Sequence, residues 1–171
     1  LTGTILTGAD LSNSNFTDVD LSGKDLTGTI LTGADLSNSI LTDVDLSGKD
    51  LTGTILTDVD LSGKDLTGTI LTGVDLSDRD LSNVILIRAN LQNAILKNSV
   101  LLDANLDSAN LTNADLRNTL LADANLSNAI LKRADLSNAV LTGVILSGAN
   151  LENAILINTI LNCVGHPICI S

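Results

Sequence analysis

Three residues near the C-terminal end have side chains that could bind a metal ion or form a disulfide. Cys163, His166 and Cys169 are spaced C-x2-H-x2-C, and thiolates and imidazole are ligands that zinc prefers. A structural zinc site needs four ligands, so the triad is a weak candidate unless two chains complete it. The two thiols would instead be reduced in the cytoplasm, or bridged as Cys163–Cys169 in an oxidising compartment. We expect no metal, a cytoplasmic location by default, and a periplasmic or lumenal one if the bridge forms.

Four cationic side chains are each followed by an aspartate, and they are the other candidates for chemistry. They are Lys24, Lys49, Lys64 and Arg79. A Schiff-base or general-base role for a lysine would need a pocket and a second acid or base group, and the sequence indicates neither. We expect their long stems to extend outward so that the charged heads reach carboxylates or solvent. The sequence therefore predicts no catalytic residue, no enzyme activity and no cofactor.

Charge is distributed unevenly along the 171 residues. The net charge is −11, and residues 1–80 contribute −10 of it, with 14 Asp against 4 Lys and Arg. A surplus of carboxylates argues against binding to nucleic-acid phosphates and against adsorption to an anionic membrane. No apolar run approaches the roughly 18 residues that a membrane-spanning helix requires. We therefore expect protein partners rather than nucleic acid or a membrane.

The residues above are carried by a repeat of five. Leucine recurs at every fifth position from Leu1 to Leu161, interrupted only by Phe16. A helix would spread these leucines around its surface, and a straight strand would point them alternately to opposite faces. The leucines share one side only if the backbone turns a corner once in each pentad. The pattern therefore predicts a chain that winds around a leucine-filled interior.

The other positions of the pentad agree with this interpretation. A small residue (Ala, Ser, Thr or Val) usually precedes the leucine by two positions, as at Ala9 and Ser14, and should face inward with it. The residue between them should point outward. Two positions after the leucine stands Gly, Asn or Asp in 29 of 33 pentads. These residue types tolerate the positive φ of tight turns, so this position is the predicted corner.

This pattern resembles the pentapeptide-repeat family, whose motif is A-(D/N)-L-x-x. Three segments that match it as they stand are Ala89-Asn90-Leu91, Ala104-Asn105-Leu106 and Ala134-Asp135-Leu136. The resemblance implies an all-β fold, a right-handed quadrilateral parallel β-helix with four pentads per coil, hence about eight coils and a rod of roughly 40 Å. We expect residues 1–165 to form one continuous β-helix and residues 162–171 a tail that caps its open end.

A compositional seam lies near residue 80. Residues 1–25 and 26–50 are nearly identical, and shortened copies follow up to residue 80, whereas the identity disappears beyond it. The chain is either one gene extended by slippage or two adjacent pentapeptide-repeat proteins joined together. The repeat phase is unbroken, so one rod is expected. Because 25-residue copies on a 20-residue coil rotate by one face, identical residues do not stack; residues 20 apart do.

Two outward columns with 20-residue spacing are the candidate binding surfaces. Asp25, Asp45 and Asp65 form a predicted acidic ladder, which either binds a cation or a basic protein, or only keeps the rod soluble. The second column is apolar and would serve self-association through the C-terminal coils, another partner, or only the stiffness of the stack. Its residues are Val100, Leu120, Val140 and Ile160, with Leu102 and Ala122 beside them.

The sequence therefore predicts a non-catalytic solenoid that acts as an interaction or scaffold protein. The alternative is an acidic DNA mimic, because members of the resembling family protect type II topoisomerases such as gyrase by imitating DNA. Four coils span about 19 Å, where duplex DNA has about 11 phosphates, and residues 1–80 carry a net −10. The near-neutral second half and the absence of loops projecting from the rod in the sequence pattern count against this alternative.

Overall fold

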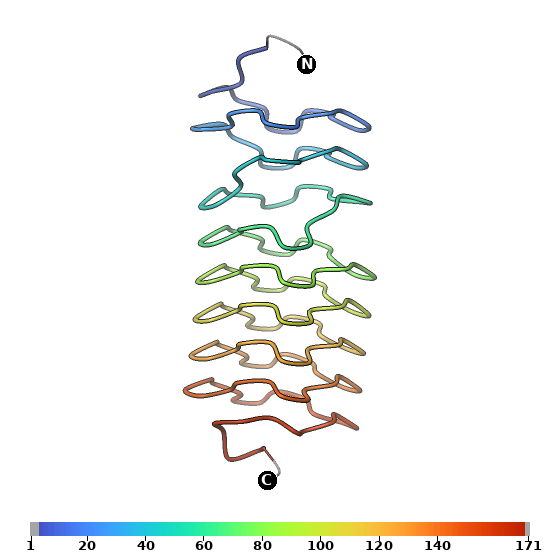
Figure 1. The fold of residues 1–171 in the computed structure, drawn as a ribbon, viewed down its shortest axis with the longest axis vertical. Helices are drawn as coiled ribbons and strands as arrows, with labels where there is room; N and C mark the ends of the chain where they lie inside the picture. The colour runs from blue at the N-terminus through green and yellow to red at the C-terminus, as the bar shows by residue number, and fades with distance from the viewer. Residues whose placement is uncertain (1–3, 170–171) are drawn as a thin grey trace.

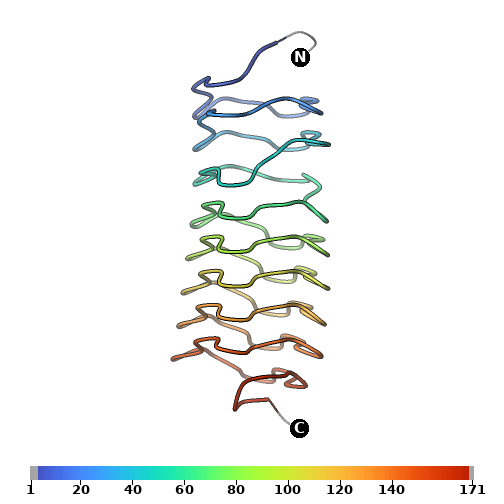
Figure 2. The same cartoon turned by 60° about the vertical axis from the view of Figure 1, so that its left-hand side comes forward.

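The chain winds into a single straight rod. The computed structural model describes residues 4–169, whose first and last coils lie at opposite ends of the rod (Figure 1). The same stack of coils is visible after a 60° rotation (Figure 2). The described residues contain no helix, and hence none long and apolar enough to cross a membrane.

Parallel backbone bridges join residues that are 20 positions apart. They run from Asp10↔Ile30 near one end to Val140↔Ile160 near the other. Most pentads contribute one bridged residue to a face, so four pentads complete a coil and the strands are single residues rather than long segments. The right-handed quadrilateral parallel β-helix of about eight coils, which the resemblance implied, is thus confirmed.

A left-handed backbone conformation makes each corner. The residue two positions after each leucine has φ between 55° and 73° at every pentad from Gly8 to Asn158. The next backbone N–H closes the turn by donating to the leucine carbonyl. The Ala94 N–H, for example, donates to the Leu91 carbonyl at 3.0 Å. The predicted corner position is confirmed, including where it is occupied by Arg88, Ser108 and Arg133 (φ 56–59°).

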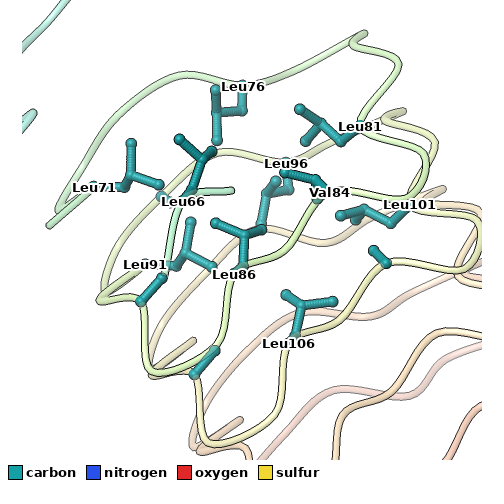
Figure 3. Close-up of a cluster of buried hydrophobic side chains, with 14 of the residues drawn as sticks. Leu66, Leu71, Leu76, Leu81, Val84, Leu86, Leu91, Leu96, Leu101 and Leu106 are labelled. Atoms are coloured by element: carbon teal, nitrogen blue, oxygen red, sulfur yellow. The ribbon is translucent and has the colours of Figure 1, made fainter. Parts of the chain in front are cut away.

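The core is a stack of leucines along the axis. Every repeat leucine from Leu21 to Leu146 is at most 3% exposed, and the central ones lie in successive layers inside the coils (Figure 3). The small residue two positions earlier is also inside, and Ala89 and Ala104 have no exposed surface. Full burial of a leucine contributes about 1.5–3 kcal/mol, so the fold is stable without aromatic layers.

The 20-residue spacing of the bridges continues across the compositional seam and changes at the tail. Bridges Asp65↔Ile85 and Asp80↔Val100 connect the two halves. Val164 pairs with Ile145 at a spacing of 19 rather than 20, and Ile168 and Cys169 pack on the end of the core. This contact supports a capping role for the part of the predicted tail that is described. Its residues 170–171 lie outside the described chain, and the division into rod and cap stays a prediction.

Arg88 offers a test of the corner geometry. A β-carbon in the left-handed region is strained by about 1 kcal/mol, and asparagine tolerates this region better. We expect Arg88→Asn to raise the melting temperature by about 2–4 °C. The matched control is Lys97→Asn, which removes a positive charge one position before a corner and should leave the melting temperature nearly unchanged. Equal shifts in both variants would contradict the explanation.

Candidate functional site

The predicted acidic ladder is exposed, and its carboxylates are engaged with their own turns. Asp25, Asp45 and Asp65 lie at equivalent positions of successive coils, without a backbone bridge between them. Each accepts a hydrogen bond at 2.8 Å from the backbone N–H two residues later. Asp45 also accepts one at 2.7 Å from the Ser47 hydroxyl. These carboxylates already accept hydrogen bonds that stabilise the corners, so a ligand would have to compete with those bonds for the carboxylate oxygens.

Hydrogen bonds of this kind lower the pKa of Asp25 and Asp45. The Thr27 hydroxyl, followed by the Thr27 N–H, lowers the pKa of Asp25 below its ordinary value. The hydroxyl and then the N–H of Ser47 lower the pKa of Asp45 in the same way. Within residues 4–169 no three His, Cys, Asp or Glu side chains gather closely enough to hold a metal ion. The role of the ladder as a binding surface stays a prediction.

The cationic side chains of the first half turn into the rod's coil junctions rather than outward. The Lys49 ammonium donates to the Leu26 carbonyl at 2.5 Å, and Lys64 donates to the Leu41 carbonyl at 2.8 Å. The prediction that their stems extend outward to carboxylates or solvent was wrong for both, because each head donates to a carbonyl of the preceding coil instead. Lys24 lies 3.5 Å from the Thr4 carbonyl.

Arg79 is the member of this group that does reach a carboxylate. Its guanidinium lies 4.0 Å from Asp58 of the preceding coil, not beside the neighbouring Asp80, and its side chain is only 18% exposed. The four cations are all half-buried. The aspartates therefore dominate the outer surface of residues 4–80 more strongly than the net charge alone indicates.

The apolar column is continuous along the C-terminal half. Bridges connect Val100 to Leu120, Leu120 to Val140, and Val140 to Ile160, so the four residues occupy one face of successive coils. Leu120 is 42% and Ile160 54% exposed, whereas the two valines are half-buried. Beside this column, Leu102 is exposed and Ala122 half-buried. The structure places the six predicted residues together, and their role as an interface stays a prediction.

Some of the charges in the second half are paired at the surface. Arg117 contacts Asp115 at 2.6 Å and lies 4.0 Å from Asp135, and Lys132 contacts Glu152 at 2.7 Å. The Arg117 hydrogen bond holds the pKa of Asp115 below its ordinary value. These exposed pairs contribute little stability. They do cancel charge locally, which leaves the aliphatic column as the distinctive feature of this half.

The cysteines of the tail are joined to each other. A disulfide connects Cys163 and Cys169, and His166 Nδ1 accepts the Ile168 N–H at 3.2 Å. In this oxidised form neither sulfur is a thiolate, so the C-x2-H-x2-C triad cannot bind zinc. Which form exists in the cell, and with it the compartment, stays a prediction.

Sequence reasoning missed a set of hollows between coils of the acidic half. One hollow of about 420 Å³ lies between Thr27–Thr29 and Asp45–Asp50. Another of about 520 Å³ lies between Asp43–Ser47 and Ser62–Asp65, and a third of about 330 Å³ is lined by Ile55 and Arg79, among others. The signal was present in the sequence as valine and lysine at the normally small inward position.

Comparison with known proteins finds a repeat family that matches the sequence and solved structures that are similar to the fold. The family described as pentapeptide repeats matches in eight copies, within residues 1–158. The crystal structure of HetL, a pentapeptide repeat protein involved in heterocyst differentiation regulation from Nostoc sp. strain PCC 7120, is 31% identical. The alignment covers 96% of this chain and 86% of HetL, with a TM-score of 0.54. A comparison with curated proteins finds no match.

Two further solved structures are similar over different lengths. Rfr23, a pentapeptide repeat protein from Cyanothece 51142, is 42% identical with a TM-score of 0.53, covering 54% of this chain and 65% of its own. QnrB1, a plasmid-mediated fluoroquinolone resistance protein, is 19% identical with a TM-score of 0.47, covering 95% of this chain and 75% of its own. The QnrB1 likeness is too distant to bear on function.

Ser47 tests the coupling between corner hydroxyls and aspartate ionisation. Ser47→Ala removes the hydroxyl that contributes most to lowering the pKa of Asp45, so this pKa should rise toward its ordinary value in a carboxyl-carbon NMR titration. The lowered pKa stabilises the folded state above about pH 4, and that stabilisation is lost as the pH falls through the folded pKa. Asp60, whose pKa is lowered by Ser62, is the internal control and should not change.

Proposed function

Because the chain belongs to the pentapeptide-repeat family, we propose that it is a non-catalytic solenoid that acts as an interaction or scaffold protein through its outer surface. The observation that carries this proposal is the filled interior. The repeat leucines occupy the axis from Leu21 to Leu146, which leaves no enclosed cavity among them for a substrate. Binding specificity must then come from the outward residue of each pentad.

The apolar column is the surface that best fits a protein contact. Val100, Leu120, Val140 and Ile160 form a stripe on four successive coils, on the half of the rod where charge is nearly balanced. Contiguous exposed aliphatic side chains favour burial against another apolar surface. A second copy of the chain is the proposed partner, because the same stripe on two antiparallel rods is self-complementary.

Leu120→Asp combined with Val140→Asp tests self-association. Two carboxylates placed in a buried stripe would lack counterions, so a dimeric parent should become monomeric at the same protein concentration. Sedimentation equilibrium measures the mass. The control is Asn98→Asp with Asn118→Asp, which adds the same charge at exposed corner positions. A dimeric parent whose mass does not change in the Leu120 and Val140 variant would exclude this stripe as the interface.

A second candidate function is that of an acidic DNA mimic that binds a type II topoisomerase. Residues 1–80 carry a net −10, and their lysine heads are withdrawn toward backbone carbonyls. Both features favour a surface dominated by carboxylates. Contact with a basic DNA-binding groove would be electrostatic and would weaken as salt concentration rises. This candidate uses the acidic half, whereas the proposed self-association uses the other.

A gyrase supercoiling assay distinguishes the second candidate. A DNA mimic at micromolar concentration should inhibit supercoiling or protect the enzyme from a quinolone. Neutralising Asp25, Asp45 and Asp65 to Asn should weaken the effect about tenfold or more at low salt, whereas Asp103→Asn with Asp123→Asn in the second half should not. Neither inhibition nor protection by the parent protein would remove this candidate and leave the scaffold proposal standing.

A further inference from the structure

The backbone ladder between coils is interrupted in a regular way within the acidic half. From Leu11 to Leu141, the N–H at each leucine or Phe16 position donates to the carbonyl 19 residues later, with six exceptions. The exceptions form three pairs: Leu26 and Leu31, Leu41 and Leu46, and Leu56 and Leu61. The reciprocal bonds from Asp45, Asp50, Asp60, Asp65, Asp75 and Asp80 to the preceding coil are also missing.

One sequence element lies above each interrupted pair. VDLSGKD occurs at 19–25, 44–50 and 59–65, and segment 74–80 reads VDLSDRD. The last three of these four segments lie above the three interrupted pairs. Each of these three supplies the carbonyls that the unpaired leucine N–H groups would otherwise reach, for example those of Asp45 and Asp50 above Leu26 and Leu31. The hollows described above lie at these same three junctions. The interruption therefore follows a sequence motif rather than a place in the rod.

The motif puts large side chains where the regular coils have small ones. At the inward position the second half mostly has alanine with no exposed surface, such as Ala89 and Ala94. The motif instead has valine and then lysine or arginine, as with Val44 and Lys49. The Lys49 head reaches the Leu26 carbonyl of the coil beneath, so the stem lies within the junction. Its volume competes with the close approach that ladder hydrogen bonds require.

The direction of the lysine explains why the pentads of Lys49 and Lys64 are open on one side only. Lys64 turns toward the preceding coil, where it contacts the Leu41 carbonyl. On the following side, Leu66 donates normally to Ile85 at 2.7 Å and Ile85 to Lys64 at 2.9 Å. Val84, stacked on Lys64, is fully buried there. A large inward side chain thus opens the junction that its head enters and leaves the next one closed.

The open junctions remain anchored elsewhere in each coil. Beside the first opening, Gly23 and Gly33 keep their ladder bonds at 2.8 and 2.9 Å, and the leucines within the opening stay at most 3% exposed. The segments 44–50, 59–65 and 74–80 recur every 15 residues on a 20-residue coil, so each opening is one face away from the last. The openings therefore wind around the rod instead of aligning on one side, where they would make a single cleft.

We propose that VDLSGKD, with its variant VDLSDRD, is a coil-opening element, and that the segments 44–50, 59–65 and 74–80 make residues 24–81 a compliant part of an otherwise rigid rod. The inward cation holds the junction beneath it apart, with unpaired backbone groups accessible to water. The leucine column and the remaining faces keep the coils in register. This segment can bend and twist by opening and closing half-coils, each made of the two consecutive pentads beneath one element. The acidic half can then adjust its shape while the C-terminal half keeps its own.

Amide hydrogen exchange in the full chain tests the proposal. The N–H groups of the six unpaired leucines should exchange at least about tenfold faster than those of Leu86, Leu91, Leu106 and Leu111. Replacing Lys49, Lys64 and Arg79 by alanine should close the junctions and slow the six amides at least about tenfold. Ser99→Ala, at a buried inward position of a closed junction, is the control and should leave the six unchanged. Unchanged exchange in the triple variant would show that the cations do not open the junctions, and faster exchange would show that they hold the coils together. Either result would overturn the proposal.

A second variant keeps the test decisive if the triple variant does not fold. Ala104→Val with Ala109→Lys places the element's two large inward residues in the regular half. The junction beneath should open, so that the amides of Leu86 and Leu91 exchange at least about tenfold faster while Leu126 and Leu131 stay protected. Continued protection of Leu86 and Leu91 in a folded variant would mean that inward volume and charge do not open a junction.

Discussion

The structure depends on a left-handed corner in every pentad. Leucines five residues apart can share one interior only if the backbone turns between them, and the residue two positions after each leucine makes that turn with φ near 60°. Four such corners close a coil of 20 residues. The requirement is strong enough to hold Arg88, Ser108 and Arg133 in the same conformation. Ladder hydrogen bonds on both sides of these residues outweigh the local strain.

A coil closed in this way has a filled interior, and this moves function to the outer surface. Leucine and alanine occupy the axis at close packing, so side chains available for recognition are those between them and at the corners. The first half presents exposed aspartates, such as Asp45, that accept hydrogen bonds from their own turns, while its cations turn inward. The second half pairs its charges and presents aliphatic residues instead. One backbone architecture therefore carries two different surfaces.

The inward small position controls how closely coils approach. With alanine at this position, as at Ala89 and Ala94, the ladder bonds form at 2.8–3.0 Å. With valine and lysine, as at Val44 and Lys49, the bonds of that half-coil are lost and a lysine–carbonyl contact replaces them. Backbone pairing and side-chain volume compete within a fixed spacing. The duplicated acidic half is therefore less regular than the diverged half, although its repeat is more uniform.

The sequence alone determined that the backbone turns a corner in every pentad around a leucine interior, because a leucine, a small residue and a corner residue recur in fixed order and each constrains backbone direction locally. The family resemblance added four pentads per coil, and with it the columns that include Val100, Leu120, Val140 and Ile160, which the parallel bridges confirm. The tertiary structure decided where long side chains end. Lys49 and Arg79 have stems that can reach either their neighbouring aspartates or the preceding coil, and the choice depends on the space between coils. That space is set by the residues stacked 20 positions away, which a five-residue pattern does not encode.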